Sequence, residues 1–362
     1  MQRFLFFITL SLFCGALAIQ ACQVPVFRYA LERWEADAYL VTITPAQQGL
    51  TAAEQAVVDL LKASSKDANA PANLEVLVSP PNTSLSTATL ELFYPRKLRG
   101  VLGHALWSGP VTRENAEGIL DSPVRAELRK RILKGESAVW VLVESGHATA
   151  DDAAAGLLEK ISQEAESILK LPDGVITPDE ALARGPHAQS KEDDILASSL
   201  PLKVDFSLLK VSRKDPKEAV LLSMLLNLED DLGDYAQEPM AFPVFGRGRA
   251  LEPLIGKGIH RDNLLEHSTY LCGACSCEVK DQNPGIDLLL AAGWDAILSD
   301  LTGLEDLAKP VTVKSDPLPA ETVTPSDSVK THTPSRTVLI WLAALLLLLG
   351  AGRLLRRGRG PA

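Results

Sequence analysis

Three of the chain's five cysteines lie within six residues, Cys272, Cys275 and Cys277 in the sequence CGACSC. A C-x-x-C pair can close a small redox-active disulfide or supply two metal ligands. A third thiol two residues further on could complete a site for a soft metal such as zinc or copper, or serve as an alternative disulfide partner. His260 and His267 precede the cluster as possible ligands, but the spacing typical of paired metal-binding histidines is missing.

Two other cysteines lie near the N-terminus. Cys14 falls in an apolar segment that we expect to be removed, which leaves Cys22 and the cluster as four cysteines outside the cytoplasm. An even number of cysteines in an oxidising compartment favours disulfides, and one bridge could join Cys22 to the cluster. Structural disulfides, a redox pair and a zinc or copper site all remain open, and the structural interpretation requires no cofactor.

A second candidate site is the sequence GRGR, which carries Arg247 and Arg249 between a predicted strand and a predicted helix. Glycines and cations in that position suggest an anion-binding loop. The sequence matches neither the P-loop pattern nor the dinucleotide-binding pattern, because Pro253 and Leu254 follow. A tight turn with two exposed arginines is the simpler interpretation, and anion binding is kept as a weak alternative.

The N-terminal segment is typical of a secretory signal peptide. Arg3 precedes an apolar run from residue 4 to residue 19, and small residues allow cleavage after Ala18 or Ala21. We therefore predict that residues 1–21 are removed, with a retained N-terminal anchor as the alternative. Lipidation at Cys22 is a further alternative, although the residue pattern before it fits a lipoprotein signal poorly.

The C-terminal segment predicts a membrane anchor. Residues 337–355 form an apolar stretch that approaches the length of a transmembrane helix. Residues 309–336 are rich in Pro, Thr and Ser and predict an extended stalk. The arginines in and after the apolar stretch mark the cytoplasmic side, with 356–362 as a basic tail: Arg353, Arg356, Arg357 and Arg359. Cleavage of this helix during surface sorting is a minor alternative.

Both ends give the same predicted topology, a single-pass protein of the cytoplasmic membrane with its bulk in the periplasm or outside the cell. The two terminal segments hold 6 of the 36 basic residues and none of the 46 acidic ones, so the part between them has a formal charge of −16. This charge argues against nucleic acid and anionic lipid surfaces as partners. The expected partner is the bilayer itself, through the C-terminal helix, and a membrane protein complex is a further candidate partner.

The first half of the predicted ectodomain, residues 22–172, has the pattern of an α/β domain. Its predicted strands are 38–44, 74–78, 90–94 and 138–144, and its predicted helices are 27–37, 51–63, 123–133 and 151–171. Thr51 and Glu54 form a capping box, and the strand–helix–strand order around that helix predicts a parallel pair of strands.

Residues 173–200 are polar and predict a linker to a second α/β half, residues 201–308. Its predicted strands are 202–211 and 240–245, and its predicted helices are 216–231, the segment after the GRGR sequence, 261–271 and 286–298. The sequence shows no internal repeat.

Several strings in these two halves resemble an uncharacterised family of exported bacterial proteins: CQVPVFRYALERW, SAVWVLVESG, PMAFPVFGRGRAL and CSCEVKDQNPGIDLL. They lie between residues 22 and 290. The resemblance implies export and an α/β fold that is thioredoxin-like in part, but it implies no activity, because the family has none assigned. We therefore expect an α/β ectodomain, thioredoxin-like in at least one half, with one transmembrane helix.

Two functional hypotheses follow. The first is a non-catalytic binding or assembly module held near the membrane, which the stalk, the anchor and the lack of a recognisable catalytic set favour. The alternative is a thiol-disulfide redox or soft-metal-binding protein that uses the cysteine cluster and Cys22. The alternative requires an accessible thiolate of low pKa, whereas structural bridges would be buried.

Overall fold

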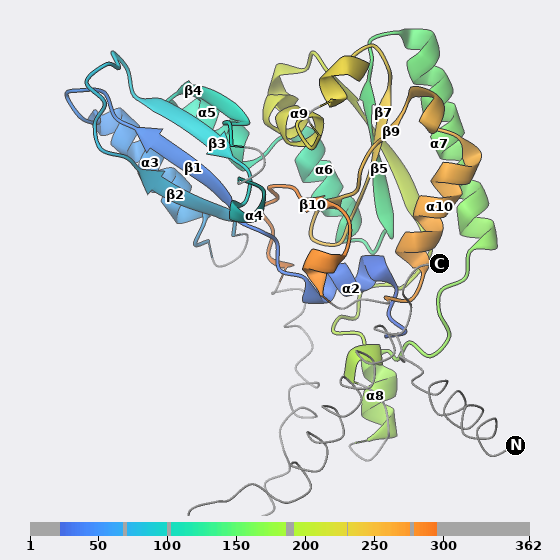
Figure 1. Ribbon diagram of the computed structural model, residues 1–362. Helices are drawn as coiled ribbons and strands as arrows, with labels where there is room; N and C mark the ends of the chain where they lie inside the picture. The colour runs from blue at the N-terminus through green and yellow to red at the C-terminus, as the bar shows by residue number, and fades with distance from the viewer. Residues whose placement is uncertain are drawn as a thin grey trace, which may run out of the picture. The chain divides into compact units, whose positions relative to one another are not determined.

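A computed structural model describes residues 22–67, 71–99, 103–185, 192–229, 231–275 and 279–294 (Figure 1). The predicted signal peptide, stalk, transmembrane helix and basic tail lie outside these residues, and so does Cys277. The described residues all belong to one compact unit, Met1–Pro310. The protein is mixed α/β and is organised around two β-sheets.

The first sheet has four strands in the order β2-β1-β3-β4. They are β1 (Tyr39–Thr44), β2 (Leu74–Val78), β3 (Thr89–Phe93) and β4 (Trp107–Pro110). Strands β1 and β2 are parallel and are joined by α3 (Ala52–Ser64), as predicted from the sequence. Strands β3 and β4 add to β1 as antiparallel strands, and α5 (Arg113–Leu120) follows β4.

The first sheet is covered on one face. Tyr39, Val41 and Ile43 of β1 are buried in a cluster with the apolar residues of α3 and α5. The alternate residues of β1 point to the opposite face, as the strand period of two requires, and they are only half-buried.

The capping box of α3 gives a first testable prediction. The Thr51 hydroxyl accepts a hydrogen bond from the Glu54 amide, and the Glu54 carboxylate accepts one from the Thr51 amide. Replacing Thr51 with Ala should lower the free energy of unfolding by about 1 kcal/mol, since orphan amides of the first helical turn lose a partner. Urea unfolding of the full chain measures this. Replacing the exposed Thr87 with Ala should change nothing, and an equal effect of both substitutions would contradict the assignment.

The second sheet has six strands, with β10-β8-β7-β5-β6 in order and β9 paired to β7. They are β5 (Ala138–Glu144), β6 (Phe206–Ser212), β7 (Met240–Phe245), β8 (Arg249–Ala250), β9 (Leu254–Ile255) and β10 (Ile286–Asp287). Strand β5 is parallel to β6 and antiparallel to β7, and every residue of β5 except its last is buried.

Helices cover both faces of the second sheet (Figure 1). The helices are α2 (Val26–Arg33), α6 (Pro123–Ile132), α7 (Ala148–Ile168), α9 (Ala219–Leu226) and α10 (Arg261–Cys272). Ala138, Trp140 and Leu142 of β5 face α2, α7 and α10, whereas the alternate valines of β5 share a cluster with α6 and α9. The short α4 (Arg96–Arg99) and α8 (Pro178–Arg184) are the remaining α-helices of the described residues.

The two sheets repeat one arrangement of strands. In order and direction, β6-β5-β7-β8 matches β2-β1-β3-β4, and α7 connects the parallel pair as α3 does in the first sheet. A helix follows the last strand in each case, α5 after β4 and α10 after β8 and β9. The sequence shows no repeat because the similarity lies in topology and not in residue identities.

The second sheet also spans the boundary predicted near Pro172. Strand β5 precedes this boundary, yet its neighbours β6 and β7 follow it. The described part of 173–200 contains α8, and Ile176 pairs with Ile195 in a parallel bridge. This segment lies between α7 and β6, so it belongs to a connection within one sheet.

Two predicted helices are wrong in the described residues. The chain from Arg249 onward forms β8 and β9, and residues 286–293 contain β10 followed by non-helical chain. Leu288, Leu289 and Leu290 are almost fully buried. A run that is buried on all sides has no periodicity that separates a helix from extended chain, which explains the error.

Candidate functional site

Three of the four candidate cysteines lie at one corner of the second sheet. Helix α10 ends at Cys272, and the chain beyond it runs antiparallel to the segment that precedes α2. The Val26 amide donates to the Gly273 carbonyl at 3.0 Å, and the Cys275 amide donates to the Val24 carbonyl at 3.0 Å. This pairing brings Cys22 into the same apolar cluster as Cys272 and Cys275, although about 250 residues of chain separate them.

The thiols at this corner are buried. Cys22, Cys272 and Cys275 expose 2%, 2% and 1% of their surface. Burial raises the pKa of Cys22, and it raises the pKa of Cys272 to about 12 against an opposing hydrogen bond from Ser137. These two thiols are not joined in a disulfide and are held in the protonated form, which is neither a nucleophile nor a metal ligand.

The local contacts of Cys22 also bear on lipidation. Its thiol donates to the Asp193 carbonyl at 2.9 Å, and the next amide, Gln23, donates to the Asp194 carboxylate at 2.8 Å. To carry a lipid, the Cys22 sulfur would have to move out of the apolar cluster in which it is buried. The geometry therefore argues against a lipid-modified Cys22.

The cysteine corner lies at the amino-terminal end of β5, because Ser137, which bonds Cys272, directly precedes that strand. Ligands of open α/β sheets usually bind outside the carboxyl ends of the strands. At that opposite end, the Asp151 carboxylate accepts bonds from the Ser145 and Gly146 amides, and the His147 ring lies 2.8 Å from Gln237. These contacts fix the loop before α7 and contain no thiol.

Among the described residues, no group of three His, Cys, Asp or Glu side chains is arranged to hold a metal ion. The two histidines considered as ligands lie on or next to α10. His260 is its exposed N-cap residue, and His267 makes a 2.9 Å hydrogen-bond contact with the Asn263 carbonyl and lies 6.2 Å from the Trp140 ring.

The prediction of two exposed arginines is wrong. Arg247 and Arg249 expose only 8% and 6% of their surface, and their donors are used inside the protein. Arg247 donates to the Leu31 carbonyl at 2.9 Å. Arg249 pairs with Asp287, donates to two carbonyls of the 283–284 turn, and lies 5.5 Å from the Trp34 ring. The two side chains therefore bind the protein's own acceptors.

The glycines of the GRGR sequence explain this burial. Gly246 and Gly248 have φ of +58° and +98°, in the left-handed region that favours glycine. A Cβ atom on Gly246 would come within 2.7 Å of the Ala30 side chain, and one on Gly248 would overlap Leu290. These glycines let the β7–β8 turn approach both α2 and the C-terminal segment. The expected tight turn is present, but its arginines are buried against the protein, which leaves no support for the weaker alternative of an anion-binding loop.

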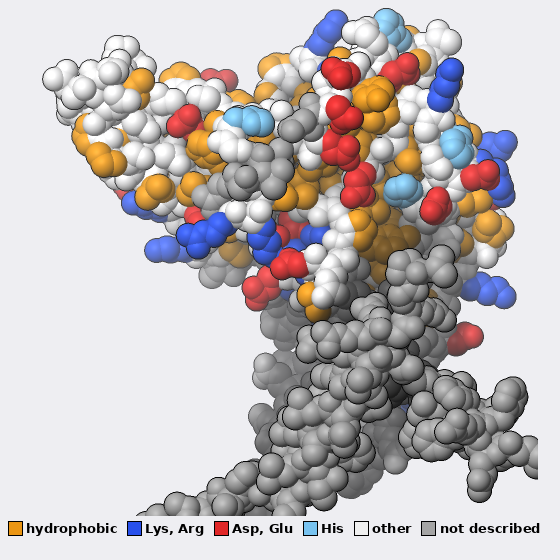
Figure 2. Space-filling view, viewed as in Figure 1, with side chains coloured by type: hydrophobic (Ala, Val, Ile, Leu, Met, Phe, Trp, Pro, Cys, Tyr) orange, Lys and Arg blue, Asp and Glu red, His pale blue; other side chains and the backbone are white. Residues whose placement is uncertain are grey.

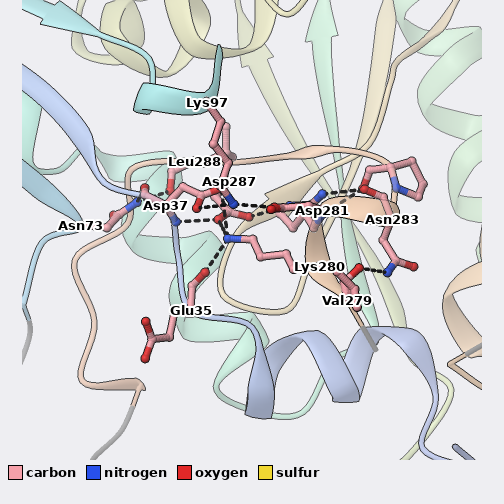
Figure 3. Close-up of polar contacts among 12 residues, drawn as sticks. Glu35, Asp37, Asn73, Lys97, Val279, Lys280, Asp281, Asn283, Asp287 and Leu288 are labelled. Atoms are coloured by element: carbon pink, nitrogen blue, oxygen red, sulfur yellow. Dashed lines mark hydrogen bonds and ion pairs between the residues drawn. The ribbon is translucent and has the colours of Figure 1, made fainter. Parts of the chain in front are cut away.

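Figure 3 shows a polar network around Asp287 that sequence reasoning missed, and Arg249 belongs to it through its pair with Asp287. Asp287 accepts from Arg249 at 3.1 Å and from the Asp37 amide at 2.7 Å, and it pairs with Lys280. Lys280 also pairs with the Asp37 carboxylate at 3.2 Å. The network continues through Lys97, which pairs with Asp37 and Asp281, so that three cations alternate with three anions.

The same network ties the first sheet to the C-terminal segment. The Asn73 side chain, just before β2, donates to the Asp37 carbonyl at 2.9 Å and to the Leu288 carbonyl at 3.1 Å. Its amide oxygen accepts from Leu290 at 3.0 Å. The Tyr39 hydroxyl donates to the Asp287 carbonyl at 2.8 Å. All of these polar groups serve internal contacts, so we assign the network a structural role.

The chain matches no protein-family model, and comparisons with curated proteins and with solved structures gave no significant match. Within the described residues, no helix has the length and apolar character needed to cross a bilayer. The predicted transmembrane helix at 337–355 falls outside that part of the chain.

Proposed function

We propose that this chain is a non-catalytic binding or assembly module, held on the outer side of the cytoplasmic membrane by residues 337–355. The observation that carries the proposal is the state of the cysteine corner. Its thiols are buried in an apolar cluster, and the pKa values of Cys22 and Cys272 are raised. Redox and metal-handling cysteines need the opposite environment, an accessible thiol with a lowered pKa.

We further propose that both sheets are thioredoxin-like units. The order β2-β1-β3-β4, with a parallel first pair and two antiparallel additions, is the order of the thioredoxin fold, and β6-β5-β7-β8 repeats it. A thioredoxin-type redox motif would lie at the start of the helix that follows the first strand. The corresponding segments here, 45–51 and 145–147, contain no cysteine. The units therefore support binding better than disulfide exchange.

The alternative function remains a redox or soft-metal protein. It is favoured by one observation, the convergence of Cys22 with the distant pair Cys272 and Cys275 in a single cluster. In that case zinc or copper would bind at this corner, with Cys277 as a further ligand, and the raised pKa values would have to fall when the metal binds.

Alkylation tests these alternatives. At pH 8, the shift of the Cys272 pKa from 9.0 to about 12 should reduce its thiolate about a thousandfold, and burial should slow its reaction with iodoacetamide further. We expect Cys272 to be unlabelled in the native full-length chain and labelled after unfolding, as mass spectrometry would show. Native labelling at the rate of a free thiol, or stoichiometric bound zinc or copper, would establish the alternative instead.

The same shift predicts a pH dependence of stability. The folded chain keeps Cys272 protonated, whereas the unfolded chain ionises near its ordinary pKa. The contribution of Cys272 to the free energy of unfolding is therefore complete below about pH 9 and is lost as the pH rises toward 12.

Membrane topology is tested separately. Protease added to intact spheroplasts should digest the bulk of the chain and leave a small C-terminal fragment protected by the bilayer. Protection of the whole chain would contradict the outward location and with it the proposed function.

A further inference from the structure

The two sheets differ in whether a helix packs on one of their faces. In the second sheet, the connection from β6 to β7 contains α9, which buries Val220, Leu221 and Met224 on the face opposite α7 and α10. In the first sheet, the equivalent connection from β2 to β3, residues 79–88, contains no helix. Among the described residues, the face opposite α3 and α5 therefore lacks the helix that its counterpart has.

The strand register defines the residues of this face, which we call the open face. It has an apolar part, a hydroxyl-rich part and two carboxylates. Its members are Leu40, Thr42, Thr44, Glu75, Leu77, Thr89, Glu91, Phe93, Ser108 and Pro110.

The apolar part of the open face lies outside both core clusters. Leu77 exposes 52% of its surface, and Leu40 and Phe93 are half-buried neighbours across β1 and β3. None of the three contributes to the buried clusters of the protein. These side chains offer an apolar surface without a described partner, in the position where α9 covers the second sheet.

The charges of the open face have one sign. Glu75 and Glu91 are its only charged residues, and neither forms an ion pair with a described residue. In Figure 2, the visible surface around β1 and β3 is mostly apolar or uncharged, and Lys and Arg gather below it, near α4. An acidic, partly apolar surface repels anionic lipid and attracts a cationic amphipathic segment.

We propose that the open face docks one amphipathic helix of a partner protein, with an apolar side over Leu40, Leu77 and Phe93 and with Lys or Arg beside Glu75 and Glu91. This inference rests on the proposed binding function and specifies its partner. Four strands spaced about 4.8 Å apart span about 14 Å, which a helix of about 10–13 residues crosses. The partner helix takes the place that α9 has on the second sheet.

The threonines and the serine of the open face bear on how tightly a partner helix binds. Helix α9 is apolar on nearly every side and is part of the core. The open face, by contrast, presents Thr42, Thr44, Thr89 and Ser108 beside its apolar residues. A surface of this mixed composition resembles a non-obligate interface, so the docked helix is expected to dissociate reversibly.

The test uses a synthetic 12-residue helical peptide with Leu on one side and Lys on the other, and the full-length chain in phosphatidylcholine nanodiscs. A scrambled peptide of the same composition is the control for lipid binding. We expect saturable binding of the helical peptide only. Photo-crosslinks from its leucine side should map to β1, β2 and β3. Binding no tighter than that of the scrambled peptide, or crosslinks on other elements, would overturn the proposal.

Variants make the test specific. Replacing Glu75 and Glu91 together with Lys should weaken binding at least about tenfold, because two attractive contacts become repulsive. A control with the same charge change, Asp59→Lys with Glu159→Lys, alters exposed residues of α3 and α7 and should leave affinity within about threefold. An equal loss in both would mean attraction by net charge alone and would overturn the site.

The Leu77→Asp variant distinguishes a partner helix from a second copy of this chain as the occupant of the open face. Leu77 is exposed, so the variant should fold, and unchanged thermal unfolding checks this. We expect it to abolish peptide binding while the chain stays monomeric before and after the change. A wild-type dimer that Leu77→Asp dissociates would show that a second copy occupies the open face, against the proposal. Thiol labelling and protease topology do not depend on these results, so failure here leaves the broader function intact.

Discussion

Replacing Asp287 with Asn should lower the free energy of unfolding by about 3–5 kcal/mol, because two cations would lose a charge that is buried with them. The Asp287 side chain is 5% exposed and pairs with Arg249, which is 7% exposed, and with Lys280, which is 13% exposed. The amide of Asn keeps the shape of the side chain but removes its charge. Urea unfolding of the full-length chain, followed by tryptophan fluorescence, measures the loss.

Asp281 provides the matched control for this change. It lies in the same network, but its side chain is 60% exposed and pairs with Lys97 at the surface. Solvent screens such a pair, so Asp281→Asn should leave the unfolding midpoint nearly unchanged. Equal effects of the two Asn substitutions would contradict the network described here.

Replacing Arg125 with Met should also cost about 3–5 kcal/mol, since it would leave buried carbonyl groups without a donor. Arg125 is fully buried and donates to the carbonyls of Ile119 and Leu289 at 2.8 and 3.3 Å, and to the Gly118 carbonyl and the Ser122 hydroxyl. Burial lowers its pKa to about 10, so the side chain remains charged at pH 7.

Arg125 thereby joins α5, the start of α6 and the segment after β10, and its loss should loosen all three. Hydrogen exchange should show faster amide exchange in α5 and in residues 288–290 of the Arg125→Met variant. Arg113→Met is the control, because Arg113 is 76% exposed and pairs only with Glu117 among the described residues. Stability equal to wild type in the Arg125→Met variant would show that its contacts contribute little.

Local signals predicted local structure well in this chain. The capping box at Thr51, the Ser122–Pro123 helix start and the unbroken apolar run of β5 all have the predicted structure. Each depends on residues a few positions apart, where periodicity and capping chemistry act directly. The parallel pairing of β1 with β2 followed from the same short-range pattern.

Such local signals could not predict contacts between residues that lie far apart in the sequence. Asp37 meets Asp287 across 250 positions, and no local pattern marks either residue as part of a network. The glycines at 246 and 248 were visible in the sequence. Only the fold shows that the absence of a Cβ atom there allows the close approach of α2 and Leu290. The cysteines were found by their unusual spacing, whereas their burial depends on a pairing with Val24 that the sequence does not reveal.

The contacts of Asp287 and Asn73 have a consequence for the order of folding. Strand β1 lies near the start of the described chain, yet Tyr39 bonds to Asp287, and Asn73 bonds to Leu288 and Leu290. These contacts form only after nearly 290 residues have been made, and closing such long loops slows folding. The first sheet is therefore expected to complete its packing late, after residues 287–290 have been made.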